Sequence, residues 1–98
     1  MSIEELQNWV SQDWEHNSGG MPSVELQLLY IMEELGEVAE AIRKSSGKKE
    51  RIEKSVDLGS ELADLIISIT TLANHYEINL ETEIEQFKAR LRSRQAKQ

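Results

Sequence analysis

Residues 24–44, with the sequence VELQLLYIMEELGEVAEAIRK, predict a long amphipathic helix. The apolar side chains of this stretch recur at steps of three and four residues, which places them on one face of an α-helix. This face comprises Leu28, Ile31, Met32, Leu35, Val38, Ala39 and Ile42. Ser23 stands where a helix N-cap is expected, and the polar run 45–49 ends the pattern. Such a face has to be buried, so the stretch predicts packing against further helices.

A shorter helix is predicted before this stretch. Ser2 followed by Glu5 has the form of a capping box, so the helix is expected to begin at Ile3. It should end by Asn17, because the run 18–22 contains two glycines and a proline. Its apolar side is formed by Ile3, Leu6, Trp9 or Val10, and Trp14.

Two more helices are predicted in the second half of the chain. One is expected to begin between residues 50 and 57 and to continue to about Tyr76; the other should run from Leu80 to around Arg94, with Asn79 as its N-cap. The apolar sides are Leu58, Leu62, Leu65, Ile66, Ile69, Leu72, Ala73 and Tyr76 in the first, and Leu80, Ile84, Phe87 and Leu91 in the second. Four amphipathic helices with short connections predict an all-α, four-helix bundle-like fold.

The composition is that of a single small domain over residues 1–98. A chain of this size buries only about two thirds of its unfolded surface, so we expect self-association, such as dimerisation, to complete the bundle. The absence of cysteine excludes a disulfide framework and a thiolate metal site. No segment approaches the roughly 18 continuous apolar residues of a membrane span, and the N-terminus lacks the features of a secretory signal. We therefore expect a cytoplasmic protein without a membrane partner.

The formal net charge of −7 argues against nucleic acid as a partner, because the phosphates would be repelled. The charge is unevenly distributed along the chain. Residues 1–42 contain nine Asp or Glu and no Lys or Arg, whereas all eleven basic residues fall within 43–54 and 88–97. In an acidic protein such clusters can meet a small anion locally, although ordinary solvated helix ends explain most of them.

Two acidic clusters stand within the helical stretches, Glu33-Glu34-Leu35-Gly36-Glu37 and Glu61-Leu62-Ala63-Asp64. At roughly 100° per residue, the members of each i, i+3 pair lie about 60° apart, on the shoulder of an apolar stripe. The first pair is Glu34 and Glu37, and the second is Glu61 and Asp64, which share their side of the helix with Ser68 and Thr71.

A divalent cation between the two helices would relieve the repulsion among these carboxylates. An all-oxygen donor set suits Mg²⁺, with Mn²⁺ as the other candidate. Solvated helix surface is the simpler interpretation of an isolated EExxE. The second cluster at the spacing of a helical hairpin favours the metal site. A di-iron carboxylate site is excluded by ligand type, because neither His16 nor His75 forms a Glu-x-x-His motif.

These motifs resemble the MazG-like, all-α nucleoside triphosphate pyrophosphohydrolases, whose hallmark is EExxE on one helix and ExxD on the next. The matching segments are residues 33–40 and 61–65, and the similarity extends over about residues 22–91, including the turn at 78–81. The resemblance implies a MazG-like domain over the chain, which hydrolyses (deoxy)nucleoside triphosphates to monophosphate and pyrophosphate. It also implies a house-cleaning role and a homodimer or homotetramer.

The resemblance further implies roles for individual residues. Carried over by motif, the metal ligands would be Glu34, Glu37, Glu61 and Asp64, with Mg²⁺ as cofactor. Glu33 or Glu34 would accept the proton of the attacking water, and the sequence leaves this choice open. Lys88 matches a family lysine near the phosphates, but Arg92 stands where relatives carry an asparagine.

Further substrate contacts are predicted from residue type. The basic residues before the second acidic cluster, Lys48, Lys49, Arg51 and Lys54, are candidates for phosphate oxygens. Trp14 is the candidate for stacking on the base, with Trp9 and Tyr30 as alternatives, and core packing is the competing interpretation of each. Two other functions stay open: a phosphoribosyl-ATP pyrophosphohydrolase-like enzyme, and a non-catalytic helical module such as an antitoxin.

Overall fold

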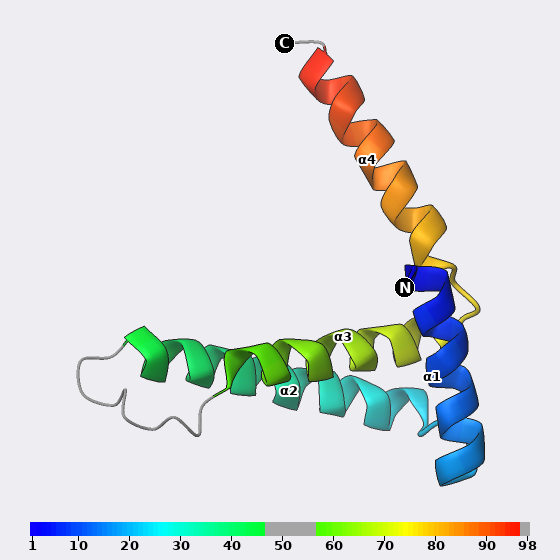
Figure 1. The fold of residues 1–98 in the computed structure, drawn as a ribbon, viewed down its shortest axis with the longest axis vertical. Helices are drawn as coiled ribbons and strands as arrows, with labels where there is room; N and C mark the ends of the chain where they lie inside the picture. The colour runs from blue at the N-terminus through cyan, green and yellow to red at the C-terminus, as the bar shows by residue number, and fades with distance from the viewer. Residues whose placement is uncertain (47–56, 97–98) are drawn as a thin grey trace.

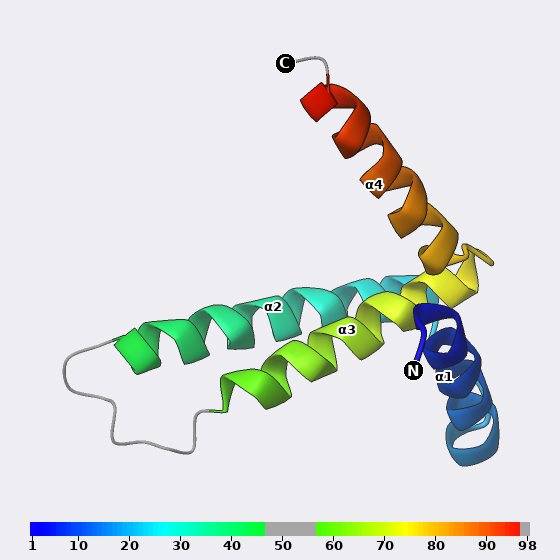
Figure 2. The ribbon, with the colours of Figure 1, turned by 45° about the horizontal axis from the view of Figure 1, so that its top comes forward.

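The computed structural model describes residues 1–46 and 57–96, which form four helices and no strand. They are α1 (Ile3–Ser18), α2 (Val24–Ser46), α3 (Leu58–His75) and α4 (Leu80–Ala96). Helices α2 and α3 lie side by side as a hairpin, α1 lies across one end of it, and α4 projects away (Figures 1 and 2). The all-α fold class is therefore confirmed. No helix in the described ranges is both long and apolar enough to cross a membrane.

The predicted helix caps are confirmed. Ser2 and Glu5 form the capping box of α1, with Glu5 N–H donating to Ser2 Oγ at 3.0 Å and Ser2 N–H to Glu5 Oε1 at 2.8 Å. Ser23 accepts from Leu26 N–H at 3.1 Å at the start of α2, and Asn79 accepts from Thr82 N–H at 2.9 Å at the start of α4.

The observed helix ends differ slightly from the predicted ones. Asp57 is the N-cap of α3, so this helix begins at Leu58, one residue after the predicted range for its start. Helix α3 ends one residue before the predicted end, while each of the other three runs one or two residues past it. At the end of α1, Gly19 takes a φ of 76°, a left-handed conformation that glycine adopts without strain.

The buried helix faces coincide only in part with the predicted apolar stripes: Ile31 and Val38 of α2 and Ala73 of α3 belong to both. Along α2, the buried or half-buried positions are Gln27, Ile31, Glu34, Val38 and Ala41, again at steps of four and three. The large residues next to this face are exposed within the chain: Leu28, Met32, Leu35 and Ile42 by 49 to 59%. On α3 the buried residues are Ser68, Thr70, Thr71 and Ala73. The fully buried residues of the two helices are thus mostly small or polar, which permits close approach.

Helix α1 packs through a single face. Val10 is 1% exposed and Trp9 is 52% exposed, so Val10 is the core residue of the predicted alternatives. One turn before Val10, the buried Gln7 joins three segments: its Nε2 donates to Asn74 Oδ1 at 2.9 Å and to Ile78 O at 2.7 Å, and its Oε1 accepts from Leu80 N–H at 2.9 Å. Gln7 therefore fixes the turn from which α4 departs.

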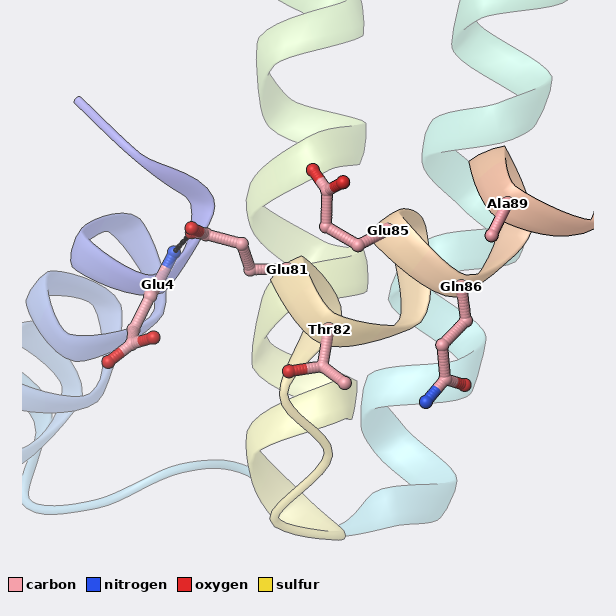
Figure 3. Close-up of a pocket in the computed structure, with 6 residues that line it drawn as sticks. All are labelled: Glu4, Glu81, Thr82, Glu85, Gln86 and Ala89. Atoms are coloured by element: carbon pink, nitrogen blue, oxygen red, sulfur yellow. Dashed lines mark hydrogen bonds between the residues drawn. The ribbon is translucent and has the colours of Figure 1, made fainter. Parts of the chain in front are cut away.

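A second contact holds the start of α4 against α1. The backbone N–H of Glu4 donates to Glu81 Oε1 at 2.9 Å, as Figure 3 shows. Asn79 Nδ2 adds a longer contact to Glu4 Oε1 at 3.4 Å. Beyond this junction α4 buries no residue of its own.

Replacing Gln7 with Met should lower the free energy of unfolding by about 2 kcal/mol, because Leu80 N–H and Ile78 O would lose their buried partner. Chemical denaturation measures this loss. Gln12→Met, an exposed change on the same helix, is the matched control and should cost less than about 0.5 kcal/mol. Equal stability of the two variants would show that Gln7 does not secure the turn.

Candidate active site

The antiparallel hairpin brings the two acidic clusters next to each other. Residue numbers rise along α2 as they fall along α3, so Glu37 faces the region of Glu61 while Glu34 faces that of Ser68. Ser68 Oγ–H donates a short hydrogen bond to Glu34 Oε1, which holds this carboxylate against α3.

Glu61 is the electrostatic centre of the acidic group. Burial raises the pKa of its carboxyl above the ordinary value, and the negative charge of Glu37 and a hydrogen bond with the Glu37 side chain raise it further. The charges of Asp64 and Asp57 act in the same direction. Glu61 Oε1 is closed to solvent and has no hydrogen-bond partner among the described residues. A cation at this point would supply the missing partner.

A cavity of about 420 Å³ opens beside these carboxylates, between α1, α2 and α3. Its wall combines Glu34 and Asp64 with aromatic, apolar and polar side chains, namely Trp14, Gln27, Tyr30, Ile67, Ser68 and Thr71. The Trp14 indole N–H donates to Thr71 Oγ1 at 3.0 Å, so α1 contributes a fixed aromatic wall. The same cavity is therefore lined by both carboxylate and aromatic side chains.

The structure brings some of the predicted site residues together and not others. Glu34, Asp64 and Trp14 line the cavity, and Glu37 and Glu61 are neighbours across the hairpin. Glu33 is exposed and does not line the cavity. Lys88 is exposed on α4, pairs with Glu85 at 3.1 Å, and is likewise absent from the wall. The predicted contacts Lys48, Lys49, Arg51 and Lys54 lie outside the described residues.

The donor chemistry of the acidic group fits a divalent cation. The donors are carboxylate oxygens, and burial together with their mutual repulsion raises the pKa of Glu61. Glu61 Oε1 lacks a hydrogen-bond partner among the described residues. Within residues 1–46 and 57–96, however, no group of three or more Asp, Glu or His side chains is arranged to hold a metal ion. Binding would therefore require these side chains to turn toward the ion.

Sequence reasoning did not single out Gln27. This residue lines the cavity and is 1% exposed, although glutamine in a helix is usually a surface residue. A periodic signal for it existed, because Gln27, Tyr30, Glu34 and Glu37 follow one another at steps of three, four and three. Ser68 and Thr71 continue the corresponding side of α3 after Glu61 and Asp64.

The fold and cavity define an all-α protein with an acidic site in a helical hairpin, and comparison with known proteins gives its family. The model of the MazG nucleotide pyrophosphohydrolase domain matches residues 23–98. The chain belongs to this family, whose members are hydrolases acting on phosphoric anhydrides. The predicted resemblance and the prediction of an enzyme are thereby confirmed. No curated protein matches the chain by sequence.

Two solved structures share the fold. One is the Bacillus-conserved MazG protein, a nucleotide pyrophosphohydrolase, with a TM-score of 0.76 and 21% identity over 93% of this chain and 89% of that one. The other is iMazG from Vibrio DAT 722, with a TM-score of 0.73 and 28% identity over 96% of this chain and 97% of that one. The arrangement of α1 to α4 is thus that of a MazG domain.

The raised pKa of Glu61 predicts a pH dependence of stability. The folded protein binds this proton more tightly than the unfolded chain, so the contribution is fully present below the ordinary value of 4.5. It is lost as the pH rises through the raised pKa. In EDTA at neutral pH, Glu61→Gln should therefore have a higher Tm than the wild type. As the pH rises above 4.5, the Tm of this variant should fall less than the Tm of the wild type.

Thermal unfolding across this pH range, with and without Mg²⁺, checks the prediction. Mg²⁺ should raise the Tm of the wild type at neutral pH more than that of Glu61→Gln, because the ion relieves the repulsion. Glu83→Gln on the exposed part of α4 is the matched control. A lower Tm for Glu61→Gln than for the wild type at neutral pH would contradict the proposed repulsion.

Proposed function

We propose that the protein hydrolyses (deoxy)nucleoside triphosphates to the monophosphate and pyrophosphate with Mg²⁺ as cofactor. The observation that carries this proposal is a cavity in which Glu34 and Asp64 adjoin an aromatic wall that includes Trp14. A nucleotide has the matching asymmetry, since its phosphates require cations and its base is a flat ring suited to stacking. Removal of a triphosphate in this way withdraws it from the polymerase pool, consistent with a house-cleaning role.

Glu34, Glu37, Glu61 and Asp64 are the residues that would hold Mg²⁺. When bound, Mg²⁺ would neutralise charge on the triphosphate and make the attacking water more acidic. The carboxylates of this chain by themselves repel a triphosphate, so their contribution is to concentrate cations beside the cavity. Burial raises the pKa of Glu61 most, and the negative charge of the neighbouring carboxylates raises it further.

Glu34 is the better candidate than Glu33 for the proton acceptor. Glu34 lines the cavity and its carboxylate is oriented by Ser68 Oγ–H, whereas Glu33 is exposed to solvent. A base has to lie within hydrogen-bond reach of the water that it deprotonates. The hydrogen bond from Ser68 would keep one carboxylate oxygen of Glu34 in place while the other accepts the proton.

Replacing Glu37 with Gln should reduce kcat for pyrophosphate release by about 10²-fold or more, because a charge that holds the cation is lost. Release from a panel of nucleoside triphosphates with Mg²⁺ measures this effect. Glu40→Gln is the matched control: Glu40 is exposed, pairs with Arg43 on its own helix, and should remain active when replaced. A fully active Glu37→Gln variant would exclude the proposed ligand set, and no cleavage of any triphosphate would exclude the function.

Self-association is the second part of the proposal, as a homodimer or homotetramer. The exposed apolar residues of α2 and α3 support it, because isolated chains rarely leave so many large side chains on adjacent helices in water. They include Leu28, Met32, Leu35, Leu62, Ile66 and Ile69, between 43 and 59% exposed. On α4, which projects away from the hairpin, Ile84 and Phe87 are likewise exposed, by 42% and 50%.

The double variant Met32→Glu, Ile66→Glu should shift the protein toward monomer, because charges would have to be buried in the interface. Sedimentation velocity measures the change. Gln12→Glu, which adds charge on an exposed part of α1, should leave the assembly intact. If the wild type sediments as a monomer at micromolar concentration, self-association is excluded.

A further inference from the structure

Helix α4 carries an apolar stripe that its own chain does not cover. The helix is attached at its first turn, where Leu80 N–H and the Glu81 carboxylate bond to α1. No residue of α4 is buried, and the helix points away from the α2–α3 hairpin in both views (Figures 1 and 2). Ile84, Phe87 and Leu91 nevertheless recur at steps of three and four, which places them on one side of the helix. This side is therefore available to another molecule.

Positive charge borders the apolar stripe of α4 on both sides. At roughly 100° per residue, Lys88 and Arg92 lie on one side of the stripe, and Arg90 and Arg94 lie on the other. All four side chains are exposed. Lys88 pairs with Glu85 on its own helix, whereas the three arginines of α4 make no salt bridge within the part of the chain that the structure describes. The described chain therefore leaves most of this positive charge without a neutralising partner.

The outer face of α2 has the complementary features. This face lies opposite the contact with α3 and is formed, at steps of four and three, by Glu25, Leu29, Glu33, Gly36 and Glu40. Leu29 is 55% exposed, and neither Glu25 nor Glu33 makes a salt bridge with any described residue. A Cβ atom at Gly36 would meet nothing within 4 Å, although glycine weakens the interior of a helix. The outer face of α2 is therefore acidic, partly apolar and open to the close approach of another helix.

We propose that α4 docks on the outer face of α2 in a second copy of this chain. The apolar stripe of α4 packs against Leu29 and Gly36 of that copy, and the arginines of α4 lie beside Glu25 and Glu33. This inference rests on the self-association part of the proposed function, and it names the two surfaces that meet. Because each copy has one α4 and one α2, two such contacts related by a two-fold axis close a dimer.

The separation of charge along the sequence identifies a second copy as the partner. Residues 1–42 hold nine acidic and no basic residues, whereas residues 88–97 hold five basic and no acidic ones. Complementary charge steers association and disfavours wrong partners. Since α4 points away from the α2 of its own chain, these opposite charges meet between copies (Figure 1). The lengths agree, because the 17 residues of α4 span about 25 Å and the 23 residues of α2 about 34 Å.

An exchange of charges between the two surfaces tests the docking. The α4 variant is Arg90→Glu, Arg94→Glu, and the α2 variant is Glu25→Lys, Glu33→Lys. Each variant by itself sets like charges against each other, so its dissociation constant in sedimentation velocity should rise by about tenfold or more. An equimolar mixture of the two variants should form a dimer again, because each contact in the mixed dimer joins opposite charges.

The control variant Ala89→Glu, Ser93→Glu adds charge at the same spacing on the opposite side of α4, and it should associate as the wild type does. The docking would be overturned by a monomeric wild type, by full association of either charge-reversed variant, or by a mixture that stays dissociated. Full association of the α4 variant together with dissociation of Met32→Glu, Ile66→Glu would leave self-association through the hairpin standing. Failure to release pyrophosphate from any triphosphate would overturn the proposed hydrolysis and not the docking.

Discussion

The close contact between α2 and α3 through small and polar side chains is the constraint on which the remainder of the structure depends. Val38, Ala41 and Ala73 fill little space, and the amide of Gln27 bonds directly to the backbone of α3. Larger side chains at these positions would separate the helices, since interhelical distance follows the size of the residues in contact. The same contact brings Glu34 to Ser68 and Glu37 to Glu61. Helix packing and the assembly of the acidic group thus have one cause.

Helix α1 connects this hairpin to the other parts of the molecule. Gln7, Val10 and Trp14 follow at steps of three and four and therefore share one face. At one end of this face Gln7 holds the turn before α4, and at the other end Trp14 closes the cavity through its bond to Thr71. A single rigid helix thereby couples the direction of α4 to the wall of the site.

The acidic group is locally unfavourable for the folded chain. Glu61 carries a raised pKa because burial and the neighbouring carboxylates destabilise its charged form. Such repulsion is common at functional sites, where a ligand of opposite charge relieves it. In this protein the carboxylates that repel one another lie next to a cavity with an aromatic wall. The residues that lower the stability of the folded chain are therefore the ones beside the candidate substrate site.

The sequence by itself determined the helices, their caps, the acidic motifs and the family, because each depends on residue type and spacing along one helix. It did not determine which face of each helix would be buried. Neighbouring faces lie only about 100° apart, so the stripe of Leu28, Met32 and Leu35 and the face of Gln27, Glu34 and Val38 are both periodic. The choice between them depends on side-chain volume on the opposing helix. Only the tertiary structure therefore exposed the large apolar residues, selected Val10 over Trp9 for the core, and placed Gln27 at the cavity with Glu34.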